Sequence, residues 1–121
     1  MKKTILTIIT ILSFTIAYSQ KAYEMTTYKG SIGKYKIVLE IVQDDYFSGD
    51  YFYLSQNKKI NFSSDEVVGN GKVILYEKVN NIKTGFFVFK NIDFEKNLLK
   101  GKWFSIDGSN SYEVILYRIN I

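Results

Sequence analysis

Carboxylates are the side chains of this sequence whose types and spacing could support chemistry. The 121 residues include no His and no Cys. Their absence excludes a Ser-His-Asp or Cys-His nucleophile and a His- or Cys-ligated zinc site. The segment Gly30-Ser31-Ile32-Gly33 belongs to a hairpin pattern and does not precede a helix, so it is no phosphate-binding loop. We therefore expect no catalytic residue, no cofactor and no metal.

Three aspartates, Asp44, Asp45 and Asp50, flank a turn expected over residues 43–47. Their oxygens are of the kind that bind a hard cation such as calcium, but their spacing matches no EF-hand loop. Charged residues at a turn also keep the edge of a hairpin soluble. The pattern favours this second role.

Glu77 lies in an alternating stretch over residues 72–79, where it shares parity with Val73 and Leu75. If that face is inward, the carboxylate is buried and must be paired or protonated. Arg118, the only arginine, has the parity of the apolar residues in the last expected strand, so an internal Glu77–Arg118 pair is one interpretation. Both faces of the stretch are partly apolar, and we favour the opposite parity, which places Glu77 in water.

A glycan hydrolase would need a second carboxylate across a cleft from Glu77. Glu40 or Glu113 could be that group, but nothing in the sequence selects either one. An enzyme is therefore the least favoured interpretation.

The elements that must position these groups are strands. Tyr35, Ile37, Leu39 and Ile41 share one face of an alternating run, and this period of two is repeated along the chain. Short Asn- and Gly-containing turns separate the runs and favour antiparallel neighbours. The pattern predicts an all-β domain, an up-and-down meander of about eight strands forming a closed or partly open barrel, with a two-sheet sandwich as the alternative. The expected strands are 23–30, 34–43, 47–55, 58–62, 72–79, 83–92, 98–106 and 112–119.

The third expected strand is rich in aromatic residues, in the sequence YFSGDYFYLS. We expect Phe52 and Leu54 to face the interior, and Tyr51 and Tyr53 to lie outside. In that arrangement the two tyrosines could form a binding face with Asp44, Asp45 and Asp50 at its rim, but the pattern favours cross-strand packing as the main role of the rings. We further expect side chains to fill the interior, with Trp103 among the buried ones.

The N-terminus has the pattern of a secretory signal peptide over residues 1–19. Two lysines precede an apolar run over residues 5–17, and Ala17-Tyr18-Ser19 provides small residues for a cleavage site. Removing these residues lowers the formal net charge from +4 to +2, because they include two lysines and no acid. We expect residues 20–121 to form one exported domain that is periplasmic or extracellular, does not span a membrane and does not bind nucleic acid.

Several motifs resemble those of small secreted all-β domains of Gram-negative bacteria that have no established function. The matching segments are YKGSIGKYKIVLEI, SGDYFYLSQNKKINF, VILYEK, TGFFVF and LLKGKW. The resemblance implies that most of the motif residues are turn glycines and sheet-packing rings. These residues are Gly30, Gly33, Tyr35, Gly49, Tyr51, Tyr53, Glu77, Gly85, Gly101 and Trp103. The architecture is also similar, by analogy, to the calycin barrels, which bind small ligands or proteins.

Ser48-Gly49-Asp50-Tyr51 is similar to an element of the bacterial lysozyme inhibitors, which insert a loop into the cleft of the enzyme. The sequence as a whole predicts a non-catalytic binding module of the cell envelope, with an envelope protein or a glycan as its partner. A lysozyme-inhibitor-like protein and a small-ligand barrel are the alternatives.

Overall fold

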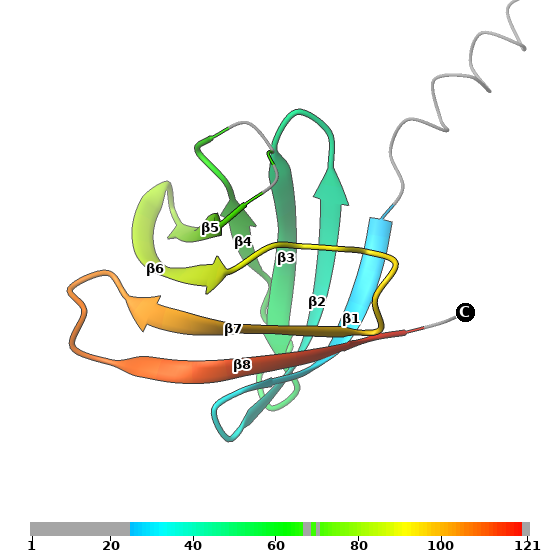
Figure 1. Cartoon of the computed structure of the whole chain (residues 1–121). Coiled ribbons are helices and arrows are strands. Elements are labelled where there is room, and N and C mark those ends of the chain that lie inside the picture. The colour runs from blue at the N-terminus through cyan, green and yellow to red at the C-terminus, as the bar shows by residue number, and fades with distance from the viewer. Residues whose placement is uncertain (1–24, 67–68, 70, 120–121) are drawn as a thin grey trace, which may run out of the picture.

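The chain forms a closed eight-stranded antiparallel barrel whose strands follow one another in sequence order (Figure 1). The structure is a computed structural model that describes residues 25–66, 69 and 71–119; the expected signal peptide lies outside these residues. The prediction of an all-β meander is confirmed, in its closed form. The strands are β1 (Met25–Ile32), β2 (Tyr35–Gln43), β3 (Phe47–Tyr53), β4 (Ile60–Ser63), β5 (Val73–Val79), β6 (Ile82–Phe89), β7 (Leu98–Ser105) and β8 (Ser111–Arg118).

Pairing between β1 and β8 closes the barrel, with a register running from Tyr28↔Arg118 to Ile32↔Val114. The tight turns contain residues that accept a positive φ. Asn80 and Asn81, at φ 52° and 64°, connect β5 to β6, as in the two-residue hairpins that match the twist of a sheet. Among the described residues, none belongs to a helix of the length and hydropathy needed to cross a membrane.

Two strands end two or more residues earlier than the sequence pattern predicts. β3 ends at Tyr53, and residues 54–59 connect it to β4. β6 ends at Phe89, and residues 90–97 run outside the sheet before β7 begins at Leu98 (Figure 1). This 90–97 connection was predicted to be partly strand, and it forms one side of the groove described below.

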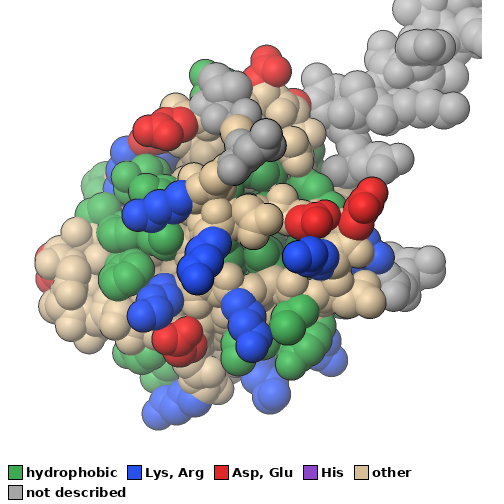
Figure 2. All heavy atoms as spheres, viewed as in Figure 1, with side chains coloured by type: hydrophobic (Ala, Val, Ile, Leu, Met, Phe, Trp, Pro, Cys, Tyr) green, Lys and Arg blue, Asp and Glu red, His purple; other side chains and the backbone are tan. Residues whose placement is uncertain are grey.

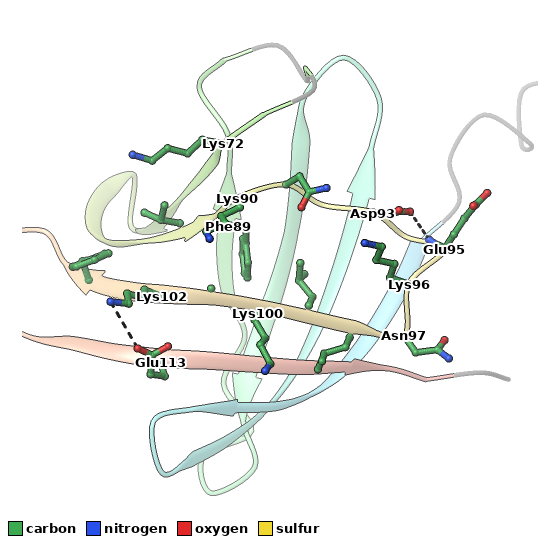
Figure 3. Close-up of a pocket in the computed structure, with 16 residues that line it drawn as sticks. Lys72, Phe89, Lys90, Asp93, Glu95, Lys96, Asn97, Lys100, Lys102 and Glu113 are labelled. Carbon is green, nitrogen blue, oxygen red and sulfur yellow. Dashed lines mark hydrogen bonds and ion pairs between the residues drawn. The ribbon is translucent and has the colours of Figure 1, made fainter.

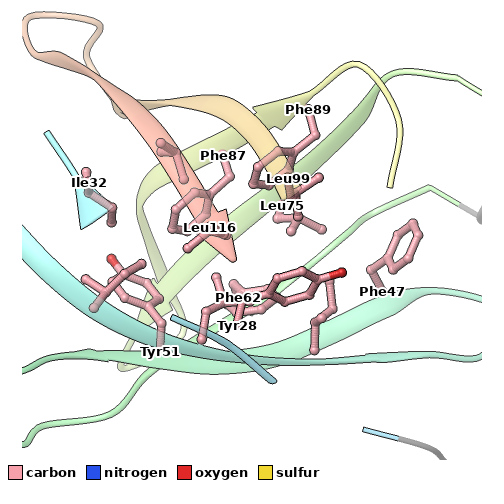
Figure 4. Close-up of a cluster of buried hydrophobic side chains, with 14 of the residues drawn as sticks. Tyr28, Ile32, Phe47, Tyr51, Phe62, Leu75, Phe87, Phe89, Leu99 and Leu116 are labelled. Carbon is pink, nitrogen blue, oxygen red and sulfur yellow. The ribbon is translucent and has the colours of Figure 1, made fainter. Parts of the chain in front are cut away.

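The interior is filled by side chains from all eight strands, as expected (Figure 4). The rings in its middle pack closely: the centroids of Tyr51 and Phe87 are 5.3 Å apart, and those of Phe62 and Phe87 are 6.1 Å apart. The buried apolar side chains are Tyr28, Ile32, Ile37, Leu39, Ile41, Phe47, Tyr51, Phe62, Val73, Leu75, Phe87, Phe89, Leu99, Val114 and Leu116.

The predicted orientation of β3 is wrong. Tyr51 is only 1% exposed and belongs to the core, whereas Leu54 is 47% exposed at the end of the strand. The reason is the register with β2, which pairs Tyr51 with the inward-facing Leu39; paired residues of adjacent strands point to the same side of a sheet. The core accepts the tyrosine because its hydroxyl has a buried partner.

Candidate functional site

The barrel interior contains a hydrogen-bonded carboxylate, that of Glu77 on β5. The residue is 6% exposed. Its Oε2 accepts hydrogen bonds from the Tyr51 hydroxyl and, at 3.2 Å, from Nε1 of Trp103. Its Oε1 accepts one from the Thr84 hydroxyl at 2.9 Å. The favoured prediction of an outward Glu77 is therefore wrong.

The register of β5 explains why the carboxylate fits inside. Glu77 is paired with Gly85 of β6, and the ladder shifts by one residue between Glu77 and Lys78. A Cβ added to Gly85 would lie 2.6 Å from the Trp103 ring and 2.9 Å from Oε1 of Glu77. The missing side chain thus provides the space in which indole and carboxylate meet.

Arg118 is not the partner of Glu77. Its guanidinium donates to the carbonyl of Phe94, at the end of the barrel that bears the 90–97 connection. Its charge acts on the buried hydroxyl of Tyr28: burial raises the pKa of this hydroxyl, and the positive charge of Arg118 lowers it in part. Glu77 lies toward the opposite end, and among the described residues no ion pair joins the two.

The groups around Glu77 are neutral donors. Burial, and after it the negative charge of Glu77, raises the pKa of the Tyr51 hydroxyl above its usual range, so this hydroxyl remains a donor. Glu113 lies on the outer face of β8 beside Lys102, at 3.8 Å, and Glu40 is paired with Asp50. Neither faces Glu77, so the two-carboxylate arrangement that glycan hydrolysis needs is not formed by these residues.

Aromatic rings form an unbroken series at the end of the barrel that contains Glu77. The ring centroids of Tyr51 and Tyr53 are 5.7 Å apart, those of Tyr53 and Tyr35 6.1 Å, those of Tyr35 and Tyr112 6.4 Å, and those of Tyr112 and Trp103 6.0 Å. Trp103 faces inward as expected, but it is only partly buried. The hydrogen bonds of Glu77 to Trp103 and Tyr51 complete the circle. The series therefore lies at the end of the barrel, with Tyr51 buried, Tyr53 and Trp103 partly buried, and Tyr35 and Tyr112 exposed.

The structure does not bring the predicted binding face together. Tyr51 is in the core and Tyr53 packs against it. Asp44 and Asp45 are exposed in the β2–β3 turn, where Asp44 accepts a hydrogen bond from the backbone of Tyr46 at 2.9 Å. Asp50 lies on the outer face of β3. Within the described ranges no group of three acidic side chains is placed to hold a metal ion.

A groove with a volume of about 1120 Å³ is present on the outer wall of the barrel (Figure 3). It lies between β7 and the 90–97 connection, and Lys72 at the start of β5 borders it. Its floor is apolar: Phe89 and Leu99 belong to the core, whereas Val88, Leu98 and Phe104 face outward or lie at the rim. Sequence reasoning missed this groove because residues 90–92 were assigned to a strand.

The rim of the groove is basic. Five lysines and three acids line it, and the corresponding face shows several basic side chains around apolar ones (Figure 2). Only one of the five, Lys102, forms an ion pair among the described residues, with Glu113. The lysines are Lys72, Lys90, Lys96, Lys100 and Lys102, and the acids are Asp93, Glu95 and Glu113.

One side of the groove is a short strand edge. The register between β6 and β7 ends at Phe89↔Gly101. The first three residues of β7, 98–100, pair with β8 through Leu98↔Tyr117, Leu99↔Leu116 and Lys100↔Ile115, and with no other described strand. The barrel is thus closed by its strand order but has a local opening in its hydrogen-bonded wall at this point.

Comparison of the chain with protein-family models, with curated proteins and with solved structures found no match.

Proposed function

We propose that this chain is an exported, non-catalytic binding module of the bacterial cell envelope that holds a macromolecular partner in the groove beside β7. The observation that carries the proposal is the contrast between interior and exterior. The interior is occupied by packed rings, whereas the outer wall has an apolar floor surrounded by lysines. Apolar centres within polar rims are typical of compact protein interfaces.

The alternatives have less support. A small-ligand barrel needs an empty interior, and rings from facing strands meet on the axis here. A lysozyme-inhibitor-like protein needs a protruding loop, but the element that resembles one, residues 48–51, lies within β3 with Tyr51 buried. A hydrolase needs an accessible carboxylate, and that of Glu77 is buried with three hydrogen-bond donors around it.

Charge reversal in the groove tests the proposal. The double variant Lys90→Glu/Lys100→Glu changes two rim lysines, and the control Lys29→Glu/Lys36→Glu makes the same change on the outer faces of β1 and β2. Each protein is immobilised and exposed to periplasmic extract and to wall polymers. We expect wild type and control to retain the same partner and the groove variant to lose it. Equal capture by all three proteins would show that the groove is not the binding surface.

A further inference from the structure

We infer that the groove binds an extended, acidic polypeptide segment that pairs with residues 98–100 of β7 as an added strand. The inference rests on the proposed function and specifies its partner. Three observations support it: the strand edge, the charge of the rim and the apolar floor.

The unpaired strand edge at residues 98–100 favours a polypeptide as the partner. Residues 98–100 are bonded to β8 on one side only, because β6 ends opposite Gly101. A strand edge presents N–H and C=O groups outward, and an extended peptide can satisfy them by adding a strand. The 90–97 connection leaves the sheet after Phe89 and so leaves room beside this edge (Figure 3). A glycan offers no comparable row of alternating donors and acceptors.

The rim of the groove favours a negatively charged partner. Five lysines and three acids line the groove. Among the described residues, four of the lysines form no ion pair: Lys72, Lys90, Lys96 and Lys100. Complementary charge steers association and excludes partners of like charge. An acidic segment is therefore the complementary occupant.

The apolar floor of the groove favours a partner segment in which apolar and acidic residues alternate. Side chains of an added strand point in turn to the two faces of the sheet. Those directed inward would lie over Phe89 and Leu99, which are buried apolar residues, and those directed outward would lie beside Lys90 and Lys100. The partner segment should therefore alternate apolar and acidic residues.

The test uses a short synthetic peptide of alternating glutamate and valine, labelled for fluorescence anisotropy. Its matched controls are the same peptide N-methylated at alternate residues, which blocks strand pairing, and a lysine–valine peptide. We expect binding of the first peptide only, weakened about tenfold or more in Lys90→Glu/Lys100→Glu and unchanged in Lys29→Glu/Lys36→Glu. Amide hydrogen exchange at residues 98–100 should slow in the complex.

Three results would overturn the inference, and the first two would leave the proposed function intact. The first is equal binding of the N-methylated peptide, which would exclude strand addition. The second is groove-dependent binding of alginate, or of a partner from the extract, with no binding of the glutamate–valine peptide. Binding to phosphatidylglycerol vesicles in place of the peptide would likewise overturn it. If no probe and no partner depended on Lys90 and Lys100, both proposals would fail together.

Discussion

At the scale of single residues, Glu77 is the group whose environment most constrains the barrel. Its carboxylate has exchanged water for the Tyr51 hydroxyl, the Thr84 hydroxyl and the Trp103 indole. Removing the charge while keeping the shape weakens bonds that gain strength from that charge. We expect Glu77→Gln to lower the free energy of unfolding in urea by about 1–3 kcal/mol.

Glu113→Gln is the matched control for this substitution. Glu113 is exposed and its ion pair with Lys102 spans 3.8 Å, so the change should cost less than about 1 kcal/mol. Equal stability of Glu77→Gln and wild type would contradict a structural role for the buried carboxylate.

Tyr51 makes the stability of the barrel sensitive to alkaline pH. Its folded-state pKa is raised above the ordinary value of 10.0, chiefly by burial. The folded state therefore holds the phenolic proton more tightly than the unfolded chain. The resulting stability is fully present below pH 10 and is lost progressively as pH rises above it.

We expect Tyr51→Phe to be less stable than wild type at neutral pH, because Glu77 loses a donor, and the difference to narrow above pH 10. The measurement is urea unfolding followed by circular dichroism across this range, with Tyr117→Phe, on an exposed side chain, as the control. If the difference in the free energy of unfolding between wild type and Tyr51→Phe stayed constant with pH, the raised folded-state pKa of Tyr51 would be disproved.

At the scale of elements, Gly101 determines how closely β6 and β7 approach beside the groove. A Cβ at this position would overlap the Phe89 ring and the backbone carbonyl of Val88. Since neither can move freely in a packed wall, we expect Gly101→Ala to destabilise the fold by about 1–3 kcal/mol. Gly71→Ala, where a Cβ would meet nothing within 4 Å, should change the stability by less than about 0.5 kcal/mol. Thermal unfolding of the two variants provides the comparison.

The alternation of apolar residues was sufficient to predict eight strands and their order, because period two and short turns leave few other arrangements. It was not sufficient to orient β3 and β5, since both faces of each strand are partly apolar. The registers with the neighbouring strands turn Tyr51 and Glu77 inward, and the hydrogen bond between these two residues, 26 positions apart in sequence, satisfies both in the core. No short-range sequence pattern predicts a contact between residues so far apart in the chain. The groove was missed for a related reason, because it depends on where the β6–β7 register stops.

At the scale of the whole molecule, the barrel depends on contact between its first and last described strands. The β1–β8 pairs join residues that are far apart in sequence, and the core draws on every strand. No subset of strands can therefore bury its apolar face alone. We expect a single cooperative unfolding transition, with coincident curves from far- and near-ultraviolet circular dichroism. Separate transitions from these two probes would indicate independently stable parts.

The bond between Trp103 and Glu77 also supplies the molecule with an optical reporter. The chain has one tryptophan, so emission excited at wavelengths that tyrosine does not absorb comes from a single indole whose N–H donates to a buried carboxylate. Trp103 stands on β7, the strand that borders the groove. Its emission wavelength and its quenching by acrylamide will therefore respond to any shift of β7 against β6, without a label and in the unmodified protein.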